Sequence, residues 1–149
     1  MKFELVSPTD PILLRKAEPV KLPDRSLSRL YSEMLHTMIV NNGCGLAAPQ
    51  VGLSMRLFTF LHKGEVGIVI NPHILEFSPE KVETIEGCLT YPDQCWKVQR
   101  SKEIVIVYAD FTGEKITRRM EDQLAIIAQH ETDHLDGILI PQHGQKVES

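Results

Sequence analysis

Apolar residues recur at helical spacing in one early segment of the chain. In residues 27–39 they lie three and four positions apart, so they share one face of a predicted helix of about four turns. Ser26 or Asp24 can cap the start of this helix, and Gly43 can end it. The preceding residues 7–24 contain four prolines, so this stretch is expected to be irregular with at most a short helix.

Apolar runs bounded by turn residues predict two β-hairpins in the middle of the chain. Their four strands are residues 55–61, 66–70, 103–109 and 114–118. Pro72 is expected to end the second strand, and a further short strand is expected at 82–85. A final helix is predicted from about Glu121 to Leu135, where Gly137 can close it. Strands grouped between two helices favour an α+β fold over a parallel βαβ sheet.

The size and composition of the chain suit one domain with one core, spanning residues 1–149. The formal charge is −4 and no long run of lysine or arginine occurs, so neither nucleic-acid nor membrane binding is expected. The basic residues Lys97, Arg100 and Lys102 are predicted to lie in a solvated loop. No apolar run is long enough to cross a bilayer and the first residues lack signal-peptide features, so the protein is expected in the cytoplasm.

The strongest chemical signal is the segment from His130 to His134, which matches the pattern H-E-x-x-H. Two histidines four residues apart share one face of a helix, so both imidazoles can bind one metal ion. Glu131 follows the first histidine, where its carboxylate can accept a proton from a water at that ion. The preceding turns are apolar, so this helix is expected to be buried, and buried histidines need partners.

A catalytic metal site usually has three protein ligands, so the third ligand distinguishes the candidate enzyme classes. One metallopeptidase pattern requires a histidine where this chain has Ile140, and another requires a glutamate on a further helix, for which little chain remains. Cys88 is the best remaining candidate, although a single cysteine is more often a small buried hydrophobic residue. Only two other cysteines occur, Cys44 and Cys95, so free thiols or a metal ligand are expected instead of a disulfide framework.

A further feature is the cluster of small residues in the segment 43–50, which reads GCGLAAPQ. Small residues permit close approach of the backbone to a substrate or to another element, and Gln50 adds one neutral amide donor. Taken alone, the segment is better explained as a tight, well-packed loop. Its G-x-G is not a dinucleotide-binding fingerprint, because it follows a helix and not a strand.

Together, these segments resemble the peptide deformylase family, whose three motifs occur in the same order. Residues 43–50 match G-x-G-x-A-A-x-Q, and residues 129–137 match Q/E-H-E-x-D-H-x-x-G. Residues 86–90 match E-G-C-x-S except that Thr90 replaces the usual serine and keeps a hydroxyl. The resemblance implies an α+β fold in which antiparallel sheets surround the H-E-x-x-H helix.

The resemblance also implies an activity and the residues that perform it. The implied activity is removal of the formyl group from the N-terminal formyl-methionine of new polypeptides, with release of formate. Cys88, His130 and His134 would bind one divalent ion, usually Fe²⁺ in this family, in a site that also accepts Zn²⁺, Ni²⁺ or Co²⁺. Glu131 would act as acid and base. The other implied residues are Gln50 and the Leu89 N–H at the formyl oxygen, Gly43, Cys44, Gly45, Ile126 and Ile127 in the substrate pocket, and the ion pair Glu86–Arg100 behind the Cys88 loop.

The chain departs from many family members at two places. Cys95 stands where many carry an arginine that is expected to contact the peptide substrate. Pro141 and Gly144 disfavour the C-terminal helix that docks some members on the ribosome, so ribosome association is expected to be transient at most. Two alternatives stay open: an H-E-x-x-H metallopeptidase that cuts unformylated peptides, and a catalytically silent deformylase-like binding module, which a fourth protein ligand would support.

Overall fold

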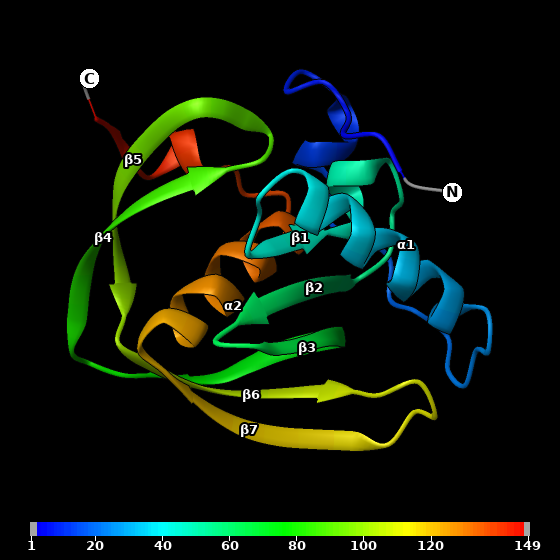
Figure 1. The fold of residues 1–149 in the computed structure, drawn as a ribbon. Coiled ribbons are helices and arrows are strands. Elements are labelled where there is room, and N and C mark those ends of the chain that lie inside the picture. The colour runs from blue at the N-terminus through cyan, green and yellow to red at the C-terminus, as the bar shows by residue number, and fades with distance from the viewer. Residues whose placement is uncertain (1–2, 148–149) are drawn as a thin grey trace.

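The computed structural model describes residues 3–147 and contains two antiparallel sheets with a helix between them (Figure 1). In spatial order the larger sheet consists of β1 (Gly45–Ala47), β2 (Leu57–His62), β3 (Glu65–Phe77), β6 (Glu103–Ala109) and β7 (Lys115–Glu121). The smaller sheet consists of β4 (Lys81–Cys88), β5 (Tyr91–Ser101) and β8 (Gln145–Lys146). The helices are α1 (Leu27–Val40) and α2 (Asp122–Leu135), with 3-10 helices η1 (Pro11–Leu14), η2 (Ala48–Val51) and η3 (Ile140–Gln142). The predicted α+β fold is confirmed.

Helix α2 packs on one face of the larger sheet, and α1 packs on the opposite face at β1 and β2. On β2, Phe58 and Phe60 pack in the core cluster of α2, while Leu57 packs in the cluster that contains Met34 and Met38 of α1. Successive residues of a strand point to opposite faces, so covering both faces explains why Leu57 and Phe58, which are neighbours in the β2 sequence, are both buried. Helix α2 contacts strands of both sheets, and this position buries nearly all of its residues.

The predicted hairpins and the closure of the second helix are confirmed. Lys63 and Gly64 join β2 to β3 with φ angles of 48° and 80°, as a two-residue turn of the kind that suits the twist of antiparallel strands. Gly137 follows α2 with a φ of 73°, a conformation that glycine adopts without a steric penalty. Among residues 3–147, no helix is long and apolar enough to cross a membrane.

The prediction that Pro72 ends its strand is wrong, because β3 continues to Phe77. Asn71 has a positive φ of 51°, and the register of β3 against β6 shifts between Ile70 and His73. Pro72 lies within this irregular stretch, where a missing N–H interrupts no regular ladder. A proline is therefore tolerated inside a long strand.

The prediction that Gly43 ends the first helix is also wrong. Helix α1 ends at Val40, and Asn42 takes the left-handed conformation with a φ of 60°. Gly43 lacks a side chain for a different reason, since a Cβ at this position would lie 2.7 Å from Cδ1 of Leu89. The glycine makes room for the residue that follows Cys88.

The prediction of a solvated loop around Lys97, Arg100 and Lys102 is wrong as well. Lys97 and Arg100 belong to β5, and only 5% of Arg100 is exposed. Buried and exposed residues alternate along the second half of this strand, with Trp96 and Val98 also buried. Arg100 is a charged residue at an inward position, and carboxylate partners inside the molecule account for its burial.

Candidate metal centre

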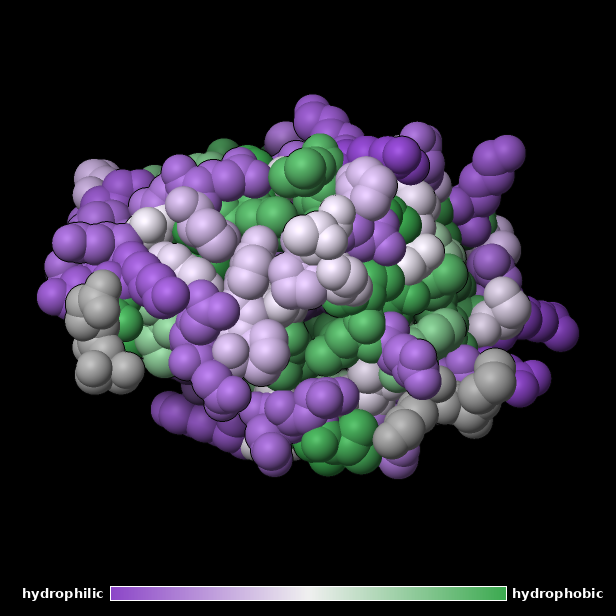
Figure 2. Space-filling model, turned by 90° about the horizontal axis from the view of Figure 1, so that it is seen from above, coloured by the Kyte–Doolittle hydropathy of each residue, from purple (hydrophilic) through white to green (hydrophobic). Residues whose placement is uncertain are grey.

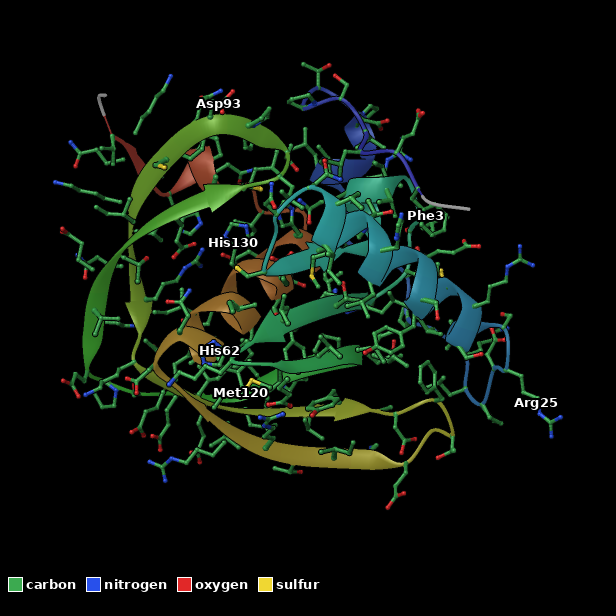
Figure 3. The ribbon with its side chains drawn as sticks, viewed as in Figure 1. Phe3, Arg25, His62, Asp93, Met120 and His130 are labelled. Atoms are coloured by element: carbon green, nitrogen blue, oxygen red, sulfur yellow. The ribbon has the colours of Figure 1, made fainter. Side chains whose placement is uncertain are left out.

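Three side chains with metal-binding atoms converge where the end of β4 meets α2. Cys88 comes from β4, and His130 and His134 come from adjacent turns of α2. Their ligand atoms all lie within 4.8 Å of one another, and Sγ of Cys88 is 3.3 Å from Nε2 of His134. Figure 3 shows His130 on α2, facing the β4–β5 hairpin, whose outer end carries Asp93. The structure therefore brings together the three ligands expected from the sequence.

The residues around this cluster fit a divalent transition-metal ion. Nδ1 of His130 lies 2.8 Å from Oε1 of Glu86, which leaves Nε2 of His130 for an ion. A carboxylate at the far nitrogen of a metal-binding histidine is the usual arrangement, since it fixes the ring and makes the ligand more basic. One thiolate and two imidazoles form a donor set that suits Fe²⁺, Co²⁺, Ni²⁺ and Zn²⁺.

Glu86 forms a buried ion pair with Arg100. The family resemblance implied this pair, whereas the composition of the chain did not. Arg100 donates from Nε and Nη2 to the two oxygens of Glu86, both at 2.9 Å, and from Nη1 to Asp133 at 2.6 Å. Burial alone would raise the pKa of Glu86, but hydrogen bonds with His130 and Arg100 outweigh it and hold that pKa well below its usual range. Glu86 is therefore ionised, and a chain of charged contacts runs from Asp133 to the candidate ligand His130.

Glu131 lies on α2 beside the candidate ligand His130. Its side chain is only 4% exposed, and Oε1 has no hydrogen-bond partner among the described residues. Burial raises the pKa of Glu131 to about 7, although the nearby His130 lowers it. A Cβ built on Gly45 would collide with Oε2 of Glu131, so β1 needs a glycine at this position. A carboxyl group with a pKa near neutrality can both accept and return a proton.

Gln50 is oriented toward the cluster by its own hydrogen bonds. Its Oε1 accepts from the backbone N–H of Ala47 at 2.9 Å, and its Nε2 donates to Oγ1 of Thr90 at 3.1 Å. Nε2 also lies 3.7 Å from Sγ of Cys88. The hydroxyl of Thr90 is thus a positioning partner for Gln50, which the sequence indicated only by a hydroxyl kept in the second motif.

A pocket of about 610 Å³ opens onto these groups, within the range of volumes typical of ligand sites. All five candidate substrate residues line it, namely Gly43, Cys44, Gly45, Ile126 and Ile127. Glu131, Gln50, Cys88 and Leu89 also line it, while His134 is 2% exposed and is not part of the lining. Figure 2 shows the molecule from above, with hydrophobic residues gathered in the middle of that face and hydrophilic ones along its margins.

Ile85 was not among the residues expected at the site, but it lines the pocket and is 64% exposed. Along β4, Ile85 shares the exposed face with Lys81 and Glu83. An apolar side chain on an otherwise charged strand face, three residues before Cys88, is the signal that would have found it.

Comparison with known protein families identifies the family of this chain. The sequence model of the family described as polypeptide deformylase matches residues 2–149. The chain belongs to the peptide deformylase family. The preference for this family over an H-E-x-x-H metallopeptidase is thereby confirmed.

Individual peptide deformylases are similar over most of the chain. The enzyme of Thermotoga neapolitana is 44% identical over 132 residues, which are 88% of this chain and 80% of that relative. The crystal structure of the Thermotoga maritima peptide deformylase superposes with a TM-score of 0.94 at 38% identity, covering 96% of this chain and 97% of the other. The Plasmodium falciparum peptide deformylase superposes with a TM-score of 0.91 at 36% identity, covering 95% and 86%. As a peptide deformylase, the chain is a metal-dependent hydrolase that removes formyl groups.

Proposed function

We propose that Cys88, His130 and His134 bind one divalent metal ion in a single catalytic domain formed by residues 1–149, and that Fe²⁺ is the native ion. The proximity of the three ligand atoms supports this assignment. The contact between Glu86 and Nδ1 of His130 supports it independently, because it directs Nε2 of that histidine toward the other ligands. When bound, the ion supplies Lewis-acid polarisation and makes water more acidic.

Glu131 is the proposed proton carrier of the hydrolysis. Its unpartnered Oε1 can accept the proton of the attacking water, and the resulting carboxylic acid can give that proton to the departing amine. Its pKa of about 7 suits both directions of transfer. The collision expected for a Cβ on Gly45 means that β1 holds this carboxylate close against the pocket wall.

Gln50 and the backbone N–H of Leu89 are the proposed donors to the formyl oxygen. Negative charge develops on this oxygen as the formyl carbon becomes tetrahedral, so donors fixed beforehand stabilise the transition state. The bonds of Gln50 to Ala47 and Thr90 support this role, because they fix the direction of the amide before a substrate arrives.

The proposed substrates are nascent polypeptides that begin with formyl-methionine. Ile126 and Ile127 offer an apolar wall for the methionine side chain, and Gly43 and Gly45 line the slot for the formyl group. Strand β1 is an edge of the larger sheet, so the backbone of Gly45 can pair with an extended peptide. An enzyme with such substrates works where they are made, so we propose the cytoplasm as its compartment and only transient contact with the ribosome.

The convergence of Cys88, His130 and His134 beside the free carboxylate oxygen of Glu131 carries this proposal. The test is anaerobic reconstitution with Fe²⁺, Ni²⁺, Co²⁺ or Zn²⁺, with formate release from formyl-Met-Ala-Ser measured before and after exposure to air. We expect the iron form to be the most active and to decay in air through oxidation at Cys88, the nickel and cobalt forms to persist, and the zinc form to be slower.

A pair of cysteine variants tests the ligand assignment in the same assay. Cys88→Ser should lose metal or activity with every ion, because an alkoxide is a poor substitute for a thiolate. Cys95→Ser is the matched control, since Cys95 is an exposed thiol on the neighbouring strand that does not line the pocket. Full activity of Cys88→Ser would refute the ligand set, whereas air-stable iron activity would refute only the oxidation argument.

A further inference from the structure

A second cavity lies on the other side of α2 from the substrate pocket and measures about 780 Å³. We call it the rear pocket; its walls include Ile74, Phe77, Lys81, Arg100, Thr132 and Ile138. It is bounded by β3, by β5 and by the end of α2. Its volume is within the range typical of small-molecule sites, and the formyl-removing reaction uses none of its space.

The two pockets use different faces of the same helix. On α2 the substrate pocket is lined by Gln123, Ile126, Ile127, His130 and Glu131, whereas the rear pocket is lined by Gln129, Thr132 and Asp133. Each set follows a spacing of three and four residues, so each forms one continuous stripe along the helix. A ligand in the rear pocket would therefore not occupy the space of the peptide substrate.

The charges of the rear pocket leave two ammonium groups without a carboxylate partner. Arg100 is held by Asp133 and Glu86, and Arg56 pairs with Asp136 at 3.0 Å, so both guanidinium groups are already neutralised. Two lysines of the lining remain, and within residues 3–147 no ion pair involves either of them. These are Lys16 and Lys81. Nζ of Lys81 donates to the hydroxyl of Ser101 at 3.0 Å and lies over the ring of Phe77, 6.0 Å from its centroid. The chain as a whole has a net charge of −4, so this cationic lining is a local feature.

The remaining lining is apolar or can donate a hydrogen bond. Ile74, Phe77 and Ile138 form the apolar part, and Phe77 is 55% exposed. Thr132 is 7% exposed, and its buried hydroxyl has no hydrogen-bond partner among the described residues.

We propose that the rear pocket binds a small amphiphilic anion, a ligand with a carboxylate next to an apolar chain. The carboxylate interacts with Lys16 and Lys81, and the chain covers Ile74, Phe77 and Ile138. Charge complementarity selects an anion, because the two free charges of the pocket are both positive. The apolar wall favours a ligand with a hydrocarbon part over a bare inorganic anion.

The probe is octanoate, titrated into the zinc-loaded enzyme, which is diamagnetic and suits NMR. Isoleucine methyl labelling separates the two pockets, since Ile74 and Ile138 report on the rear pocket and Ile85, Ile126 and Ile127 on the substrate pocket. Acetate tests the charge alone, 1-octanol tests the chain alone, and octylammonium tests the opposite charge. Lys16→Gln/Lys81→Gln removes the two free cations, and Lys115→Gln is the control at an exposed lysine outside both linings.

We expect saturable shifts of the Ile74 and Ile138 methyl signals with octanoate, at lower concentration than with the other three compounds. The double lysine variant should weaken this binding about fivefold, and the Lys115 variant should leave it unchanged. Shifts confined to Ile85, Ile126 and Ile127 would place octanoate in the substrate pocket and overturn the proposal. The proposal would also be overturned if the enzyme bound 1-octanol as tightly as octanoate. The same holds if the double lysine variant bound octanoate as tightly as the wild type.

Discussion

Replacing Arg100 by methionine is expected to weaken metal binding without changing a ligand. The guanidinium group makes three charged hydrogen bonds, two to Glu86 and one to Asp133. Methionine fills a similar volume but leaves the carboxylate of Glu86 buried, with His130 and Thr84 as its remaining hydrogen-bond partners among residues 3–147. The ring of His130 then loses its fixed orientation, because the carboxylate that holds it is no longer anchored.

The magnitudes follow from the burial of this pair. Removing one partner of a buried ion pair costs about 3–5 kcal/mol, and the lower end applies here because Glu86 keeps two hydrogen bonds. At about 2–4 °C per kcal/mol for a chain of this size, the melting temperature should fall by about 6–12 °C. Metal affinity should fall by about 10–100-fold, the usual effect of losing a partner behind a ligand. Competition with a chelator measures the affinity, and circular dichroism of the metal-loaded protein measures the melting temperature.

The chain provides a matched control in Arg118, which also pairs with a glutamate through two nitrogens. Its bonds to Glu65 measure 2.7 and 2.9 Å, but both side chains are about a third or more exposed and lie outside both pockets. Solvent screening limits such a pair to about 1 kcal/mol or less, so Arg118→Met should retain its metal fully. Arg100→Lys keeps the charge but loses the bidentate contact, and it should fall between the wild type and Arg100→Met. If Arg100→Met and Arg118→Met show the same metal affinity and the same melting temperature, Arg100 does not hold His130 in place through Glu86.

Three further substitutions test the other residues of the site. Glu131→Gln keeps the size of the side chain but removes the base, so formate release should fall by at least ~10²-fold at near-normal metal content; normal turnover would reject the role of Glu131. Gln50→Ala should lower kcat by an amount equal to roughly 3 kcal/mol in the barrier, whereas steady-state kinetics with only a raised KM would make Gln50 a ground-state contact. Gly45→Ala places a methyl group against Oε2 of Glu131 and should lower kcat by about 10²-fold in a folded, metal-containing protein; an unchanged kcat would show that Glu131 tolerates displacement.

The spacing of apolar residues and the positions of turn residues were sufficient to predict the elements whose burial pattern repeats regularly along the sequence. The helical spacing of residues 27–39 and the turn residues of both hairpins correctly located α1, β2, β6, β7 and the start of β3. Pattern failed where a distant contact overrides a local preference. Pro72 lies inside a strand because the β3–β6 register shifts beside it, and Arg100 lies inside the molecule because Glu86 and Asp133 neutralise it. Strand β5 was missed for the same reason, since its charged residues resemble a surface loop until their partners are known.

The sequence by itself determined the family and the chemical types at the site. The spacing of His130 and His134 places two imidazoles on one helix face whatever the helix packs against, and the motif around Cys88 narrowed the choice of enzyme. Only the tertiary structure decided how these groups are supported. Glu86 reaches His130, Thr90 orients Gln50, and β1 meets Glu131 at a glycine, all across sequence separations that no local pattern specifies. These contacts depend on α2 lying between two sheets, and that arrangement follows from burying both of its faces at once.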